Sequence, residues 1–160
     1  MKILVLSDTH IPRTAADLPA EVYEAARKAD MVLHAGDFTD AEVLDKLNRV
    51  SKVCAVYGNM DDARLRGTLT DRQVVQAGRF KIGLIHGYGA PAQLIDTVAG
   101  QFTGVDAVVF GHSHSATNVL KGGVLFFNPG SPTDTVFASR RSYGLLEVGE
   151  DKIEGMIIEL

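Results

Sequence analysis

Seven polar side chains of types that bind metal ions stand where apolar runs of the sequence stop. They fall in the stretches LSDTH, HAGDF, YGNMD, LIHGY and FGHSH, and are Asp8, His10, Asp37, Asn59, His86, His112 and His114. Each stretch alone is a weak signal, because a strand-end aspartate or asparagine is usually a turn residue. Their occurrence together, with four of the five histidines of the chain, favours a metal site.

The spacing of these residues indicates how they converge. Asp8 and His10 are two residues apart, as are His112 and His114. In an extended backbone such residues point to the same side, so each pair can address one centre. Imidazole nitrogens, carboxylates and an amide oxygen suit Mn²⁺, Fe²⁺, Co²⁺, Ni²⁺ or Zn²⁺ better than Ca²⁺. Seven ligands are too many for one tetrahedral ion and suit two ions that share a bridging carboxylate.

The charge of such a site points to an anionic substrate. Two divalent ions, the carboxylates of Asp8 and Asp37, and a bridging hydroxide sum to roughly +1. Paired ions recur in enzymes that attack phosphorus in line, because they activate water and neutralise phosphoryl oxygens. Phosphate ester hydrolysis is therefore the leading chemistry.

The elements that must position these residues alternate in the first half of the chain. Strand-like runs at 2–6, 31–36 and 52–58 are separated by amphipathic helical segments at 18–29 and 39–50. The second segment opens with Thr39 and Glu42, the spacing of a capping box. This β-α-β-α-β order predicts a mostly parallel sheet, in which ligands gather at the carboxyl ends of the strands.

The second half is richer in strands. Hairpins are expected at 72–87, 118–128 and 143–160, a short helix at 91–99, and a buried strand at 106–111. About nine strands exceed what one small sheet usually holds. Two stacked sheets with helices outside are therefore expected.

Composition bounds the class of protein. The chain of 160 residues predicts a single domain, 1–160, with an ordinary globular composition of 46% hydrophobic residues. A net charge of −4 gives no strong nucleic-acid signal, and no apolar stretch is long enough to span a membrane. The single cysteine, Cys54, predicts a buried, inert thiol and fits a reducing compartment, so a cytoplasmic location is expected.

The same residues resemble a known family. The stretches DTH at 8–10, GD at 36–37, GNMD at 58–61, His86 and GHSH at 111–114 are similar in type and order to motifs of the calcineurin-like metallophosphoesterases. They most resemble the small bacterial and archaeal phosphodiesterase branch, over residues 3 to about 132. The resemblance implies an α/β fold, a four-layer αββα sandwich of two mixed β-sheets flanked by helices.

The resemblance also implies an assignment of ligands to two divalent ions. It places Asp8, His10 and His114 on one ion, Asn59, His86 and His112 on the other, and Asp37 between them. Asp37, Asn59 and His112 are expected to be catalytic as well as metal-binding. Mn²⁺ is favoured, with Ni²⁺, Fe²⁺, Co²⁺ or Zn²⁺ as alternatives. The stretch NPGSPT at 128–133 is expected to line or support the site.

The leading hypothesis is a dinuclear metal-dependent phosphodiesterase, in which a metal-bound hydroxide attacks a phosphate-ester substrate in line. The alternatives are a phosphomonoesterase on the same site, a weakly active or non-catalytic scaffold, and a single structural zinc. Whether the chain forms a homo-oligomer is left open. Met60 bears on the choice, because many family members have a proton-donating histidine there, oriented by the acidic residue that follows. Methionine has no proton to donate, so slow turnover of alkyl phosphates is expected.

Four further polar residues stand near the motifs. His34 lies inside an apolar run, and a hydrogen-bonded structural role is expected rather than a direct ligand. Arg13, Arg64 and Arg66 flank motif loops and either hold a phosphate or are solvated surface charges.

Overall fold

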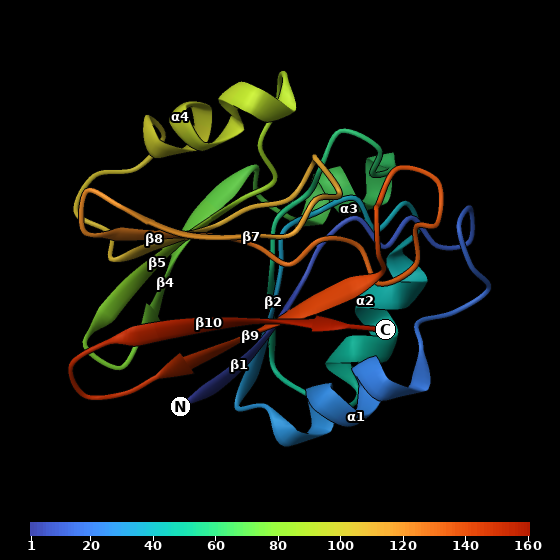
Figure 1. Ribbon diagram of the computed structural model, residues 1–160. Coiled ribbons are helices and arrows are strands. Elements are labelled where there is room, and N and C mark those ends of the chain that lie inside the picture. The colour runs from blue at the N-terminus through green and yellow to red at the C-terminus, as the bar shows by residue number, and fades with distance from the viewer.

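Two five-stranded sheets face each other, and helices cover both outer sides (Figure 1). The computed structural model describes residues 1–160. The strands are β1 Lys2–Leu6, β2 Met31–His34, β3 Val53–Ala55, β4 Arg72–Ala77, β5 Phe80–Ile85, β6 Ala107–Val109, β7 Thr117–Lys121, β8 Val124–Asn128, β9 Ser142–Val148 and β10 Ile153–Glu159. The helices are α1 Ala20–Lys28, α2 Ala41–Asn48, α3 Ala63–Thr68 and α4 Leu94–Ala99, the last preceded by a 3₁₀ turn, Pro91–Gln93.

Three apolar clusters hold the four layers together. On β1, Ile3 and Val5 point into the cluster between the two sheets, whereas Leu4 and Leu6 point into the cluster beneath α1 and α2. All four side chains are fully buried, which explains why this strand is a continuous apolar run rather than an alternating one. A third cluster packs α4, through Val98, onto the second sheet. The predicted αββα sandwich is confirmed.

Parallel strands bring separate parts of the chain to one end of the sandwich. The first sheet has the order β10-β9-β1-β2-β3, with β1, β2 and β3 parallel. The second has the order β4-β5-β6-β8-β7, with β5, β6 and β8 parallel. The carboxyl ends of these parallel strands carry the loops that contain the predicted ligands.

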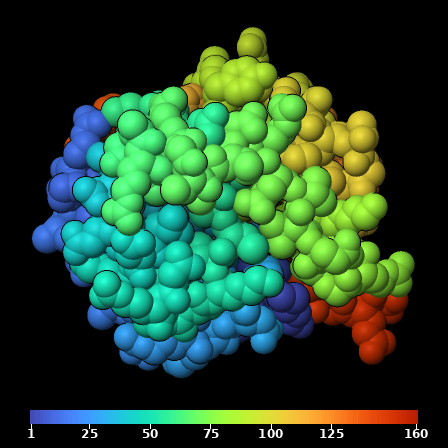
Figure 2. All heavy atoms as spheres, turned by 180° about the vertical axis from the view of Figure 1, so that it is seen from behind, coloured from blue at the N-terminus to red at the C-terminus, as the bar shows by residue number.

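The three predicted hairpins form antiparallel pairs, β4–β5, β7–β8 and β9–β10. The turns of the first and last of these lie side by side, as the green and red segments of Figure 2 show. Arg79 and Asp151 join them across 3.6 Å. This contact lies at the end of the sandwich away from the predicted ligands. None of the helices is long and apolar enough to cross a membrane.

Two local predictions were wrong, and one helix was missed. The N-cap of α2 is Asp40, whose side chain accepts from the Glu42 amide, because Thr39 has a left-handed backbone (φ 78°) that does not suit a capping residue. Cys54 is only half-buried, since it lies on the edge strand β3. Helix α3 was not predicted; it is a short helix capped by Asp62.

Candidate metal centre

The seven predicted ligands all follow strands whose carboxyl ends lie at one end of the sandwich. Loops after β1, β2 and β3 of the first sheet contribute four of them: Asp8, His10, Asp37 and Asn59. Residues after β5 and β6 of the second sheet contribute the other three: His86, His112 and His114. The candidate centre is therefore shared between the two sheets.

Left-handed backbone distinguishes these loops from the rest of the chain. Six non-glycine residues have positive φ, and five of them are predicted ligands: Asp8 (54°), His10 (44°), Asp37 (58°), His112 (70°) and His114 (56°). Such conformations are costly for residues with a Cβ and cluster at functional sites, where the surrounding structure imposes them. The extended backbone expected for the two spaced pairs was wrong.

The consequence is clearest for the second pair, because the two imidazoles diverge. His114 Nε2 lies 3.4 Å from Asp8 Oδ1 and 3.2 Å from His10 Nε2, so these three residues form one group. His112 instead turns toward Asn59, with 3.2 Å between its Nδ1 and the amide oxygen Oδ1.

The contact of His112 with Gly89 determines which of its ring nitrogens keeps a free lone pair. Its Nε2 lies 3.2 Å from the carbonyl oxygen of Gly89, to which it can donate, and this leaves the lone pair of Nδ1 facing Asn59. An imidazole lone pair and an amide oxygen are both electron donors, and a cation between them satisfies both.

A second buried group joins the two carboxylates. His86 Nε2 lies 3.3 Å from Asp37 Oδ2 and 4.0 Å from Asp8 Oδ1. The Nδ1 of His86 pairs with the carbonyl oxygen of Ala35 at 2.8 Å, whereas its Nε2 is buried without a hydrogen-bond partner. Buried polar atoms without a hydrogen-bond partner are rare, and a bound ion would give this nitrogen a partner.

The pKa values of the site follow from burial and charge. Burial lowers the pKa of His10, which favours its neutral, metal-binding form. Burial also acts against protonation of His86, but the carboxylates of Asp37 and Asp8 outweigh it and raise the pKa of His86 to about 9. For Asp37 burial acts upward, yet the contacts with His86 and the Met60 amide leave its pKa lowered. The Asp37 carboxylate therefore stays charged beside His10 and His86, an environment that attracts a cation.

Two glycines allow the carboxylates to approach the backbone. A Cβ on Gly58 would lie 2.1 Å from Asp37 Oδ1, and one on Gly111 would lie 2.7 Å from Asp8 Oδ2. These positions need glycine for space, and neither has a positive φ. The freed room lets the amides of Met60 and His112 donate to Asp37 Oδ1 at 2.7 Å and to Asp8 Oδ1 at 3.2 Å.

Asp61 has a structural role that the sequence did not reveal. Its carboxylate accepts hydrogen bonds from the amides of Asp37 (3.0 Å), Thr39 (2.8 Å) and Gly58 (2.7 Å). It was expected to stand where a carboxylate orients an imidazole at position 60. In this chain it also ties the loop after β3 to the loop after β2, and each of its oxygens accepts at least one hydrogen bond.

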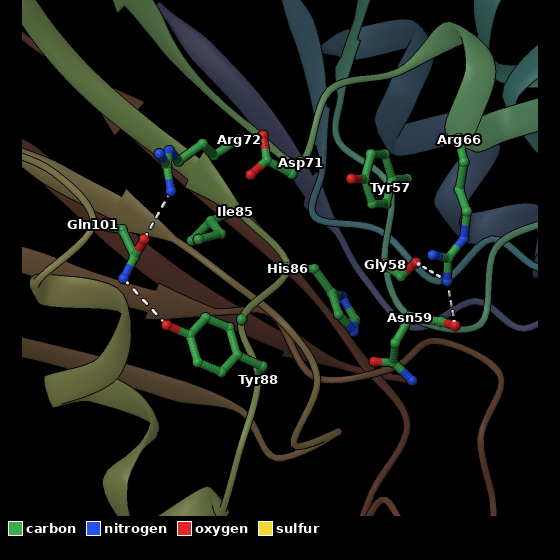
Figure 3. Close-up of a pocket in the computed structure, with 11 residues that line it drawn as sticks. Tyr57, Gly58, Asn59, Arg66, Asp71, Arg72, Ile85, His86, Tyr88 and Gln101 are labelled. Carbon is green, nitrogen blue, oxygen red and sulfur yellow. Dashed lines mark hydrogen bonds between the residues drawn. The ribbon is translucent and has the colours of Figure 1, made fainter.

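Arg66 supports the same loop from α3. Its guanidinium donates to the carbonyl oxygens of Asp61 (2.9 Å), Gly58 (3.3 Å) and Asn59 (2.6 Å), as Figure 3 shows for the last two. Of the other two arginines, Arg64 pairs with Asp45 on the surface, whereas Arg13 lines a cavity beside His10.

Asp134 is a buried carboxylate that the sequence analysis missed. It accepts from Nδ1 of His114 and from the amides of Val136 (2.7 Å) and Phe137 (3.1 Å). No motif marked it, because it lies one residue beyond the NPGSPT stretch.

The NPGSPT stretch itself supports the site, as expected. Ser131 and Thr133 donate through their hydroxyls to the carbonyl oxygens of Asp8 (2.7 Å) and Thr9 (2.6 Å). His34 is fully buried, accepts from the Gly36 amide at 3.2 Å and stacks on Phe38, so its predicted structural role is confirmed.

Comparisons with known proteins agree with this geometry. The calcineurin-like phosphoesterase superfamily domain matches residues 1–151. A probable metallophosphoesterase of Methanocaldococcus jannaschii is 37% identical over 163 residues, covering 100% of this chain and 82% of the relative. Another, of Methanothermobacter thermautotrophicus, is 35% identical over 161 residues, covering 99% and 92%. This chain belongs to the calcineurin-like phosphoesterase superfamily.

The solved structures add a relative with bound metal. Vacuolar protein sorting 29 from Entamoeba histolytica, in complex with Zn²⁺, superimposes with a TM-score of 0.75 at 26% identity, covering 99% of this chain and 99% of that chain. The family and the buried Asp and His cluster together indicate a metallophosphoesterase.

Proposed function

We propose that this protein is a dinuclear metal-dependent phosphodiesterase. The observation that carries the proposal is the convergence of two buried groups that share one carboxylate, Asp8–His10–His114 and Asp8–Asp37–His86. The orphaned Nε2 of His86 and the facing donor atoms of Asn59 and His112 fit cations. Ligands of this kind suit borderline divalent ions, with Mn²⁺ favoured.

The first group supplies Asp8, His10 and His114, which would hold one ion. Asn59, His86 and His112 would hold the other. Asp37 would lie between them, because its Oδ2 is 3.6 Å from His10 Nε2 and 3.3 Å from His86 Nε2. When bound, paired ions lower the pKa of a coordinated water and neutralise charge on phosphoryl oxygens.

The protein contributes rigidity and charge to the reaction. Amide donors from Met60 and His112 fix the Asp37 and Asp8 carboxylates, so their charge is in place before substrate arrives. Arg13 lines the cavity that includes His10 and Asp37, and its guanidinium can pair with phosphoryl oxygens. Met60 lines the same cavity without a transferable proton, so a good leaving group is expected to react best.

The test is hydrolysis by protein reconstituted with Mn²⁺. Bis(p-nitrophenyl) phosphate and p-nitrophenyl phosphate share one leaving group, so their kcat/KM values separate diesterase from monoesterase activity. Asp37→Ala and His112→Ala should each lower diester hydrolysis by several orders of magnitude, about 10³-fold or more. Asp96→Ala is the matched control, because Asp96 pairs only with Lys121 on the surface.

Two results would contradict the proposal. Activity unchanged in the Asp37 and His112 variants would place the chemistry elsewhere. A monoester preferred over the diester would make the protein a phosphomonoesterase on the same site.

A further inference from the structure

Two cavities border the candidate metal centre: His86 lines one, His10, His112 and His114 line the other, and Asn59 lines both. The tyrosine cavity, of about 240 Å³, is lined by Tyr57, Arg72, Tyr88 and Gln101, with Asn59 and His86 toward the metal centre (Figure 3). The phenylalanine cavity, of about 320 Å³, is lined by Arg13, Met60, Val136 and Phe137, with His10, His112 and His114 at its base. A phosphate at the metal centre therefore has two separate cavities beside it.

The walls of the tyrosine cavity combine aromatic rings with hydrogen-bond donors. Tyr57 and Tyr88 come from opposite sides of it, after β3 and β5 (Figure 3). Arg72 donates to Gln101 Oε1 at 2.8 Å, and Gln101 donates to the Tyr88 hydroxyl at 3.3 Å. The remaining guanidinium nitrogens of Arg72 and the Tyr57 hydroxyl have no partner in the protein. An aromatic group with acceptor substituents matches these walls, because it can pack on the rings and accept from the free donors.

The phenylalanine cavity has a different character. Val136 and Phe137 are each 78% exposed and Met60 is 40% exposed, so three apolar side chains face solvent beside the site. Arg13 is the one cation among its lining residues. This wall suits an apolar ligand group attached to an anion.

A phosphodiester carries two organic arms on one phosphorus, and a monoester carries only one. We infer that the two cavities receive the two arms of a diester, and that the tyrosine cavity takes an aromatic arm bearing hydrogen-bond acceptors. This inference rests on the proposed function, and it names the residues that distinguish a diester from a monoester. A monoester can place its single arm in either cavity, so loss of one cavity still leaves it a place to bind.

Variants of the tyrosine cavity test the inference. Tyr88→Ala and Arg72→Leu remove an aromatic wall and a donor, and both side chains are outside the metal centre. With Mn²⁺-loaded protein, each should raise KM for bis(p-nitrophenyl) phosphate about tenfold with little change in kcat. For p-nitrophenyl phosphate, kcat/KM should change less than about twofold, because the second arm is absent. Arg79→Leu is the matched control: it makes the same change beyond the other end of β4, where Arg79 faces Asp151.

The outcomes separate this inference from the proposed function. Equal losses for diester and monoester, or an unchanged KM for the diester, would overturn the inference. If the wild-type protein hydrolyses neither ester, the proposed activity fails, and calorimetric titration of the same two esters still decides where the arms bind. In that titration, Tyr88→Ala should weaken binding of the diester alone; equal weakening of both esters, or of neither, would overturn the inference.

Discussion

The Nδ1 atom of His114 donates a hydrogen bond to the Asp134 carboxylate, and this contact decides which imidazole nitrogen faces the metal centre. Nε2 is left with its lone pair, 3.4 Å from Asp8 Oδ1. The Asp134 carboxylate is itself held by the Val136 and Phe137 amides. A carboxylate behind a metal-binding histidine fixes the ring and makes it a better ligand.

Asp134→Asn should therefore weaken metal binding. An asparagine side chain has one acceptor oxygen, so it cannot accept from the backbone amides and from His114 with separate oxygens, as Asp134 does. The expected loss of affinity for Mn²⁺ or Zn²⁺ is about 10–100-fold, measured by competition with a chromophoric chelator. Asp96→Asn, on the surface, should bind metal like the wild type. Unchanged affinity in Asp134→Asn would show that the contact is only structural.

A pair of glycine variants tests the close approach of Asp37 to the loop after β3. Gly58→Ala places a Cβ 2.1 Å from Asp37 Oδ1, so the carboxylate must move and metal binding should be lost. Gly67→Ala makes the same change in α3, where a Cβ meets nothing within 4 Å. It should stabilise the protein by about 0.5–1 kcal/mol, because alanine favours a helix over glycine. Thermal unfolding and bound-metal analysis of both variants check this prediction; a fully metal-loaded Gly58→Ala would contradict it.

Met60→His should restore only part of the rate enhancement that general acid catalysis can give. Three backbone amides already hold the Asp61 carboxylate in place, so it cannot turn toward a new imidazole and will orient it less well than a mobile carboxylate would. The gain on a poor leaving group should be near the lower end of general acid catalysis, about 10²-fold, and confined to pH below about 6.5.

The pH profile of kcat/KM for an alkyl and a p-nitrophenyl diester measures that gain. The p-nitrophenyl ester should change little, because its leaving group needs no proton. Met60→Gln, which cannot titrate, is the control. No improvement at any pH would mean that position 60 does not face the leaving group.

His34 makes stability depend on pH. Burial lowers the pKa of His34 well below its ordinary value of 6.5. Between the lowered pKa and about 6.5 the unfolded chain binds a proton that the folded protein excludes, so the free energy of unfolding falls as the pH falls below about 6.5. The slope from one such group approaches about 1.4 kcal/mol per pH unit.

His34→Gln removes this proton and should flatten the slope by that amount. Urea unfolding of both proteins between pH 5 and pH 7, with chelator present, gives the two slopes. Glutamine loses the stacking on Phe38, so the variant should be less stable at neutral pH. Parallel slopes for the two proteins would mean that His34 is protonated in the folded state.

Hydrophobic periodicity predicted the fold because the buried strands are continuous apolar runs, whereas the outer helices have one apolar face. The fully buried run Ile3 to Leu6 requires apolar cover on both faces, and only a sheet between two other layers gives it. The cap at Asp40 and the helix Ala63–Thr68 were missed because both depend on the conformation of loops near the site.

The residue types also predicted that the candidate ligands lie close together, but the extended backbone assumed for the two spaced pairs was wrong. Extended backbone would place His112 and His114 on one side, whereas their left-handed φ angles send them to different neighbours. Asp134 was missed because no local pattern connects it to His114, 20 residues earlier in the chain. Such a contact exists only once the loop after β8 has folded over the end of β6.

The sharing of the centre between the two sheets has a consequence for how the chain folds. Neither sheet alone holds either buried group, since Asp8 is in the first layer and His86 and His114 are in the second. Bound ions would thus join segments that are roughly 50 to 100 residues apart in the chain, much as a cross-link closes a long loop. The rate of metal binding during refolding would then report the rate at which the two sheets pack against each other.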